Sequence, residues 1–274
     1  ESAPHRPMAG ATDLLVALTA ELGPAPERVL DLWRLDELRG IAVRDGALEL
    51  GALTTYAEIR ASAECRAHAP ILVEAAATIG AAQIQNRGTL GGNVVNASPA
   101  GDTLPVLLAL DATLVAVGPR GEREIAAADF WPAYRRTALA PDELLARVRI
   151  PRSDGRVEHF RKVGTRRAQA ISKVMLATAW RREPAGGTEL RHGVRIALGS
   201  VAATAVRAHA AETLLEGAPA TAETTEAAVA ALRAELQPID DVRSTAAYRR
   251  EVACRVLRRI LEDDAAPGGR PGRK

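Results

Sequence analysis

The spacing of hydrophobic positions changes several times along the chain, and each change predicts a structural element. Near the N-terminus the apolar run 7–9 meets Gly10, and a second apolar run follows over 14–18. This pattern predicts a strand, a tight turn and a helix, with Thr12 or Asp13 able to cap the helix.

Short strands and helices are predicted for the rest of the first half. Residues 28–32 predict a strand, and the apolar runs on either side of Asp45 and Gly46 predict a hairpin, because Asp-Gly is a favoured two-residue turn. Helices are predicted over 55–63 and 70–79, the second opened by a first-turn proline. A short apolar helix leading into a strand over 103–118, and a further strand over 142–151, complete this half.

Ser, Asp and Gly cluster at 152–156 and predict a linker between two halves. Beyond it, periodicity predicts strands over 157–164, 170–180 and 194–201, with a turn at 184–187. Helices follow over 205–217, 221–236 and 245–263. Because strands and helices are mixed in both halves, the predicted fold class is α+β. The Gly, Pro and basic residues of 263–274 predict a disordered tail.

The last predicted helix separates apolar from basic positions. Its apolar face carries Tyr248, Val252, Val256, Ile260 and Leu261. Its arginines fall largely outside that face, and they are Arg249, Arg250, Arg255, Arg258 and Arg259. Two interpretations stay open for this basic face: a surface in contact with solvent, or a contact with another subunit.

Composition narrows the classes of function. The formal charge is only +2, which does not suggest the concentrated basic surface of a nucleic-acid-binding protein. The two cysteines, Cys65 and Cys254, cannot supply the ~four ligands of an iron–sulfur cluster or a structural zinc, so buried free thiols are expected. No stretch approaches the ~20 apolar residues of a membrane span and no signal peptide is visible, which favours a cytoplasmic protein.

The motifs of several enzyme classes are absent. The sequence has no G-x-G-x-x-G, no P-loop and no G-x-S-x-G, and its histidines lack metal-ligand spacing. We therefore predict neither a catalytic residue nor a metal site. A hydrolase, kinase or metalloenzyme would need residues that no motif marks.

Two glycine-containing turns stand out, AGATD (9–13) and TLGGN (89–93). Glycine lets a ligand approach the backbone closely, and successive free N–H groups form an anion-binding site. Two such turns suit a pyrophosphate held from two sides, although each alone could be an ordinary tight turn. Asp102 follows the second turn and could accept hydrogen bonds from a ribityl or ribose hydroxyl.

The run QIQNRGTLGGNVVNASPAGDTLPVLLAL (83–110) resembles the FAD-binding signature of the flavoprotein (medium) subunit of molybdenum hydroxylases. This family includes xanthine dehydrogenase and carbon monoxide dehydrogenase. AGATDLLV (9–16) is similar to its first FAD turn, and FRKVGTRRAQAISKV (160–174) to the start of its C-terminal domain. The segments 194–217 and 238–261 are similar to two further family segments, in the same order.

The resemblance implies a fold and a set of cofactor-binding residues. The fold would be a two-part FAD-binding domain of the PCMH type, vanillyl-alcohol-oxidase-like, over 1–153, followed by a smaller α+β domain over 157–262. Asp102 would reach the ribityl chain, Ile79 and Leu145 would line the flavin, and Lys162 would lie near it. The residues implied for the two pyrophosphate turns are Pro7, Met8, Ala9, Gly10, Ala11, Thr12, Asp13 and Leu14, and Thr89, Leu90, Gly91, Gly92 and Asn93.

Two departures from the family pattern bear on this expectation. Ala11 stands where the family usually has a second glycine, and a positive φ there would cost an alanine roughly 1–2 kcal/mol. The chain also begins shortly before the first turn, without the strand and helix that precede it in the family. We therefore expect the domain to be truncated at its start.

The resemblance also implies a role. The chain would carry FAD and pass electrons from the [2Fe–2S] clusters of a small partner subunit to NAD⁺, oxygen or a quinone. A large molybdopterin subunit would hydroxylate the organic substrate, and the complex would be a dimer of heterotrimers. Two alternatives remain: a freestanding FAD-dependent oxidase or reductase, and a scaffold subunit without flavin.

Overall fold

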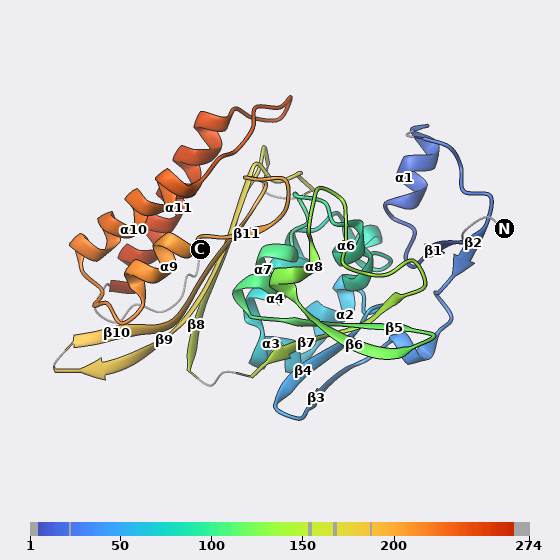
Figure 1. The fold of residues 1–274 in the computed structure, drawn as a ribbon, viewed down its shortest axis with the longest axis horizontal. Coiled ribbons are helices and arrows are strands. Elements are labelled where there is room, and N and C mark those ends of the chain that lie inside the picture. The colour runs from blue at the N-terminus through green and yellow to red at the C-terminus, as the bar shows by residue number, and fades with distance from the viewer. Residues whose placement is uncertain (1–4, 22, 153–154, 167–168, 187, 266–274) are drawn as a thin grey trace.

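The computed structural model describes residues 5–21, 23–152, 155–166, 169–186 and 188–265. Three sheets of two, five and four strands organise them, with helices packed around the two larger sheets (Figure 1). The predicted linker lies partly, and residues 266–274 of the predicted tail wholly, outside the described residues. Residues 263–265 of that predicted tail belong instead to the last helix. None of the described helices combines the length and the apolar character needed to span a bilayer.

The N-terminal segment has the predicted strand, turn and helix. Strands β1 (Arg6–Met8) and β2 (Val29–Asp31) pair in parallel, and α1 (Leu14–Thr19) connects them. A 3-10 turn, η1 (Asp36–Leu38), leads into the next sheet. No residue of α1 is buried, so this segment stands at one side of the molecule (Figure 1).

The five-stranded sheet is antiparallel with the order β3-β4-β7-β5-β6. The predicted hairpin joins its first two strands, and both Asp45 (φ 47°) and Gly46 (φ 72°) adopt the left-handed conformation that this turn requires. The edge strand over Gly121–Ala126 was not predicted, because nearly all of its side chains are exposed and show no apolar alternation. The strands are β3 (Ile41–Arg44), β4 (Ala47–Gly51), β5 (Thr113–Gly118), β6 (Gly121–Ala126) and β7 (Leu144–Pro151).

Short helices cover this sheet. The predicted helix over 55–63 ends early, because Ser62 is extended and caps a new helix by accepting a hydrogen bond from the Cys65 amide. The predicted turn at 89–93 is instead the start of a helix. Cys65 and Cys254 are buried free thiols, as expected. The helices are α2 (Tyr56–Ala61), α3 (Ala63–His68), α4 (Pro70–Thr78), α5 (Ala82–Gln85), α6 (Leu90–Asn96), α7 (Leu104–Ala109) and α8 (Ala127–Phe130).

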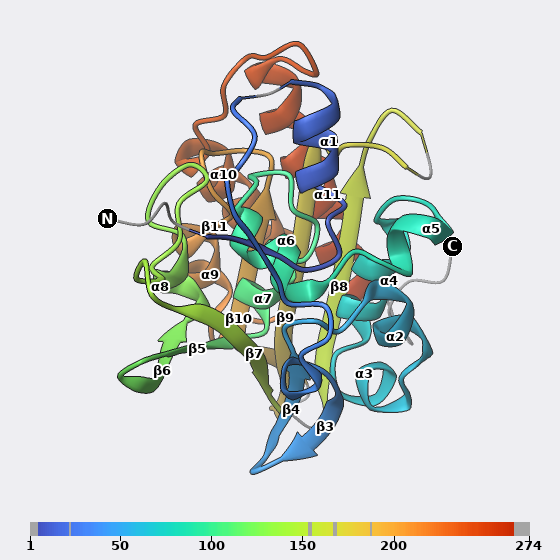
Figure 2. The same cartoon turned by 90° about the vertical axis from the view of Figure 1, so that its right-hand side faces the viewer.

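The second half is a four-stranded antiparallel sheet covered by three helices. The strand order is β11-β10-β9-β8, and α9 to α11 lie on its outer face (Figures 1 and 2). The predicted helix over 205–217 starts late, because Val206 and Arg207 pair with the neighbouring strand. The elements are β8 (Arg156–Val163), β9 (Val174–Ala185), β10 (Thr188–Gly199), β11 (Val206–Arg207), α9 (His209–Leu215), α10 (Ala222–Glu235) and α11 (Ala246–Ala265).

Alternation along β9 joins the two halves. Leu176 and Trp180 pack with the outer helices, whereas Ala177 and Ala179 belong to the core of the first half. The small alanines let α7 approach the inner face of the sheet, and α7 contacts both β9 and β10. This sheet is therefore a layer shared by two hydrophobic cores.

One prediction for the last helix is wrong. Arg249 is only 2% exposed, and its guanidinium donates to the carbonyls of Lys173 and Ser200 and to Asp241. A buried arginine with these partners fixes the segment before α11 to the ends of the strands. Tyr248, which the pattern placed on the apolar face, is 43% exposed.

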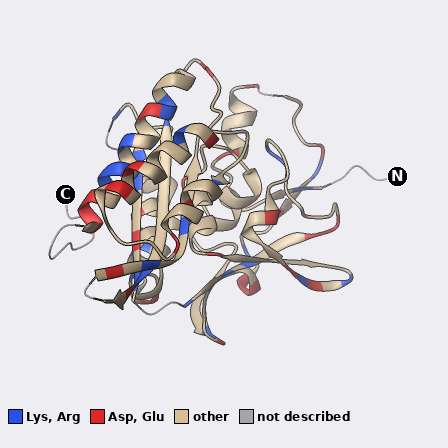
Figure 3. Ribbon diagram, turned by 60° about the vertical axis from the view of Figure 1, so that its left-hand side comes forward, with Lys and Arg blue, Asp and Glu red and all other residues tan. Residues whose placement is uncertain are grey.

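Three other arginines of α11 lie on the surface, as the interpretation of a solvent-facing basic face expects. Arg255, Arg258 and Arg259 pair with acidic residues of α10 and α11, and positions of both charges occur along these helices (Figure 3). Exposed pairs of this kind contribute little to stability.

Candidate cofactor site

The turn Gly10–Asp13 links β1 to α1 and exposes backbone donors. Gly10 lies so close to the chain at Arg87 that a Cβ on it would be 1.7 Å from the Arg87 carbonyl oxygen. Ala11 has φ 63°, the left-handed conformation anticipated for the missing glycine. Among the described residues, none accepts a hydrogen bond from the amides of Ala11, Thr12 or Asp13. The turn therefore offers consecutive N–H groups to a ligand.

The segment 89–93 has the opposite character. It forms the first turn of α6, and Gly91 is packed so tightly that a Cβ would lie 2.7 Å from the Ala52 carbonyl oxygen. The amides of Leu90, Gly91, Gly92 and Asn93 all have partners inside the protein, so these four are not free to bind a phosphate. These bonds run from Leu90 to Thr54 O, Gly91 to Ala52 O, Gly92 to Thr89 Oγ1 and Asn93 to Thr89 O, at 2.8–3.1 Å.

A pocket of about 330 Å³ lies between these two segments. It brings together most of the predicted residues, although they come from three separate stretches of sequence. Those that line it are Pro7, Met8, Ala9, Gly10, Ala11, Thr12, Asp13, Leu14, Thr89, Gly91, Gly92, Asn93 and Leu145. Ile79, Leu90, Asp102 and Lys162 do not line it.

The pocket also contains residues that sequence reasoning missed. An apolar wall comes from Leu32, Leu38, Leu53, Val95, Leu139 and Leu144, and polar groups come from Arg6, Tyr56, Asn96, Arg135 and Glu143. No local motif marks these positions, because they reach the pocket only through the pairing of distant strands and the packing of helices.

A polar network closes one side of the pocket. Asn96 donates from Nδ2 to Asp13 Oδ1 at 3.2 Å, and Arg135 donates to Asn96 Oδ1 at 2.9 Å. Partial burial raises the pKa of Asp13, opposed by the positive charge of Arg135. The Asp13 side chain makes no capping bond to α1, so the predicted capping role is wrong for this residue.

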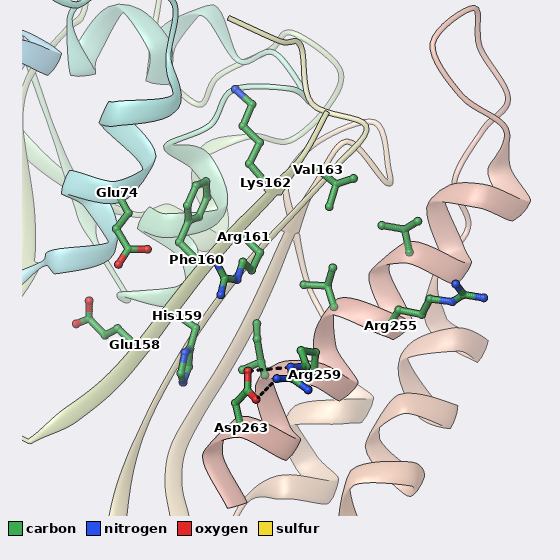
Figure 4. Close-up of a pocket in the computed structure, with 13 residues that line it drawn as sticks. Glu74, Glu158, His159, Phe160, Arg161, Lys162, Val163, Arg255, Arg259 and Asp263 are labelled. Carbon is green, nitrogen blue, oxygen red and sulfur yellow. Dashed lines mark hydrogen bonds and ion pairs between the residues drawn. The ribbon is translucent and has the colours of Figure 1, made fainter. Parts of the chain in front are cut away.

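Asp102 and Lys162 form a buried pair outside the pocket lining. Lys162 is ion-paired with Asp102 Oδ2, donates to the Thr78 carbonyl at 3.2 Å, and points away from Glu158 and His159 (Figure 4). Burial raises the pKa of Asp102 even though Lys162 opposes the shift. The pair ties the first half of the chain to β8, and Asp102 is not free to bind a hydroxyl with Oδ2.

Lys162 also borders a second cavity, of about 280 Å³, between β8 and α11 (Figure 4). Leu90 and Ile79, the other two predicted residues that do not line the first pocket, belong to the main core. Leu90 is 0% exposed, and Ile79 packs against this core at the end of α4. Within the described residues, no group of His, Cys, Asp or Glu side chains is arranged to hold a metal ion.

The chain matches two families along its length. Residues 1–153 match the FAD binding domain in molybdopterin dehydrogenase, and residues 159–263 match the CO dehydrogenase flavoprotein C-terminal domain. The chain belongs to this family of FAD-binding molybdenum hydroxylase subunits. It is thus an oxidoreductase subunit, and the resemblance noted in the sequence is confirmed.

Individual relatives agree over most of the chain. The nicotinate dehydrogenase FAD-subunit of Eubacterium barkeri is 32% identical, covering 96% of this chain and 89% of the relative. The carbon monoxide dehydrogenase medium chain of Hydrogenophaga pseudoflava is 32% identical, covering 86% and 81%.

Solved structures support the fold. Carbon monoxide dehydrogenase from Hydrogenophaga pseudoflava superimposes with a TM-score of 0.89 at 31% identity, covering 94% of this chain and 88% of that one. Quinoline 2-oxidoreductase from Pseudomonas putida 86 gives a TM-score of 0.87 at 28% identity, covering 95% and 89%. The predicted α+β architecture is confirmed.

The pocket fits the FAD that the family binds. Free amides at Ala11 to Asp13 and the Arg6 side chain suit an anionic pyrophosphate, and the leucine wall suits an apolar ring system. Gly92 leaves space on the opposite side, where an added Cβ would meet only Thr89 Oγ1.

Proposed function

We propose that this chain holds FAD in the pocket between Gly10–Asp13 and Thr89–Asn93 and serves as an electron-transfer subunit. The observation that carries the proposal is that the amides of Ala11, Thr12 and Asp13 have no partner among the residues the structure describes and lie at the wall of a pocket that continues onto leucines. Bound FAD supplies the redox chemistry, while the protein supplies binding and orientation.

The residues divide into four roles in this proposal. The first turn holds the pyrophosphate through its backbone, and Gly92 and Asn93 form the opposite wall. Leu145 and the other leucines contact the flavin ring. Ile79, Leu90, Asp102 and Lys162 do not line the pocket and support the fold around it, Leu90 and Ile79 at the main core and Asp102 and Lys162 as a buried ion pair.

We further propose that the chain acts within a complex. Electrons would arrive from the [2Fe–2S] clusters of a small subunit, beside a large molybdopterin subunit, in a dimer of heterotrimers. They would leave to NAD⁺, oxygen or a quinone. The buried cysteines Cys65 and Cys254 support clusters on another chain, since two thiols cannot ligate one. A cytoplasmic location and a domain division at 152–156 belong to the same proposal.

Co-expression with candidate partner subunits tests this function. We expect a stable complex that contains about one FAD per copy of this chain, and flavin absorbance that bleaches with the organic substrate and returns with the acceptor. A complex without flavin would support the scaffold alternative. Isolation of this chain as an active oxidase by itself would support the freestanding alternative.

A further inference from the structure

The wall formed by Thr89–Asn93 cannot offer backbone donors from Leu90 onwards, so hydrogen bonds from that side must come largely from side chains. Tyr56 is placed to provide one. It lines the pocket and is 4% exposed, and among the described residues its hydroxyl has no hydrogen-bond partner. The oxygen is not among the buried polar atoms sealed from solvent, so it opens into the pocket.

The position of Tyr56 is fixed by its surroundings. It is the first residue of α2, directly after a capping box in which Thr55 and Glu58 bond each other's amides. Its own amide donates to the Gly88 carbonyl at 3.3 Å. A Cβ on Gly88 would lie 2.7 Å from Tyr56 Cε2, so the ring packs against this glycine. The phenol is therefore held in place before any ligand arrives.

The surroundings also fix the protonation of the hydroxyl. Burial, together with the nearby carboxylates of Asp13 and Asp102, raises the pKa of Tyr56 above its ordinary value. Neither carboxylate accepts a hydrogen bond from the hydroxyl: Asp13 Oδ1 accepts from Asn96 and Asp102 Oδ2 from Lys162 and Thr78, while the buried Asp102 Oδ1 has no partner among the described residues. The hydroxyl thus keeps its proton and lacks an acceptor, whereas nearly all buried tyrosine hydroxyls have one.

We propose that the Tyr56 hydroxyl donates a hydrogen bond to an oxygen of bound FAD and positions the cofactor against the second glycine segment. This inference rests on the proposed FAD site. Tyr56 is a positioning residue here, because it supplies a fixed donor where the backbone supplies none.

Titration of the flavin-free full-length chain with FAD tests the inference, using flavin fluorescence to obtain the dissociation constant. Tyr56→Phe removes one oxygen and keeps the ring, and we expect the dissociation constant to rise about 5- to 10-fold. Tyr248→Phe is the matched control, because this tyrosine is 43% exposed on α11 and should leave FAD binding unchanged.

A second measurement separates a ligand contact from a structural role. Without FAD, Tyr56→Phe should unfold at the wild-type temperature, and only the increase produced by FAD should shrink. Equal dissociation constants for wild type and Tyr56→Phe would overturn the inference while leaving the FAD site intact. A wild-type chain that binds no FAD would overturn the proposed function as well.

Discussion

The segments Gly10–Asp13 and Thr89–Asn93 are similar in composition, but they differ in the hydrogen bonding of their backbone amides. In the first, the amides of Ala11 to Asp13 have no hydrogen-bond partner within the described part of the chain, and Ala11 has a positive φ. In the second, every amide from Leu90 to Asn93 is bonded within the protein. Glycine therefore serves two purposes in one pocket: at Gly10 it allows an open turn to dock, and at Gly91 it allows a helix to pack.

The two segments also differ in how they are held. Helix α6 contributes Leu90 and Val94, both 0% exposed, to the main core. Helix α1 contributes no buried residue. Regions with few buried apolar contacts open locally at low cost. We therefore regard the second segment as a fixed wall and the first as the more loosely held side of the pocket.

The largest expected effect concerns the buried pair of Lys162 and Asp102, and Asp102 is next in sequence to Thr103, the donor to Asn93 Oδ1 in the fixed wall. Lys162→Met should lower the free energy of unfolding by about 3–5 kcal/mol, because it leaves the buried Asp102 carboxylate without its counter-charge. Arg120→Met is the control: its pair with Asp142 is exposed, so its loss should leave the free energy of unfolding nearly unchanged. Denaturant unfolding measures both. Equal losses would mean that the buried pair contributes no more to stability than the exposed one.

The next prediction compares the glycines directly. Gly10→Ala should cost about 3 kcal/mol, because its Cβ cannot fit beside the Arg87 carbonyl. Gly92→Ala should change stability by no more than about 1 kcal/mol, since helix propensity favours alanine and only Thr89 Oγ1 lies close. Thermal unfolding of both variants checks the order, and the reverse order would contradict the packing described here.

A substitution at Ala11 should have a smaller effect, and one of opposite sign. Ala11→Gly should stabilise the chain by about 1 kcal/mol, because glycine adopts the positive φ without strain but has more freedom when unfolded. Ala17→Gly, inside α1, should instead destabilise it by about 1 kcal/mol. If Ala11→Gly were destabilising, strain at this turn would not be present.

The smallest effect depends on pH at the rim of the pocket. Hydrogen bonds from Arg123, and then from the Ala140 amide, lower the pKa of Glu143 to about 2. Because the folded value lies below the ordinary value of 4.5, this carboxylate stabilises the fold above pH 4.5, and the contribution is lost as the pH falls toward 2. Unfolding temperatures measured across this range should converge for wild type and Glu143→Gln.

Sequence patterns predicted much of this molecule where the signal was local. The Asp45-Gly46 hairpin and the strand-turn-helix around Gly10 follow from turn chemistry and periodicity. The helix at Leu90–Asn96 was not predicted because two glycines lower its helix propensity, whereas in the fold Thr89 caps it, Leu90 and Val94 are buried and Gly91 packs against Ala52.

The site was predicted less completely than the fold. No motif marks Tyr56 or Arg135 as a site residue. They approach the turn Gly10–Asp13 only in the folded chain. The burial of Arg249 could not be predicted for the same reason, because two of its partners, Lys173 and Ser200, lie far from it in the sequence and the third is Asp241. Tertiary contacts of this kind leave no spacing in the sequence to recognise.

Amide hydrogen exchange with and without FAD tests the central claim most directly. We predict that FAD slows exchange at Ala11, Thr12 and Asp13, whose amides gain acceptors, while the amides of Leu90 to Asn93 exchange slowly in both states. The opposite pattern, with new protection at Gly91 and Gly92 and none at the first turn, would contradict the account.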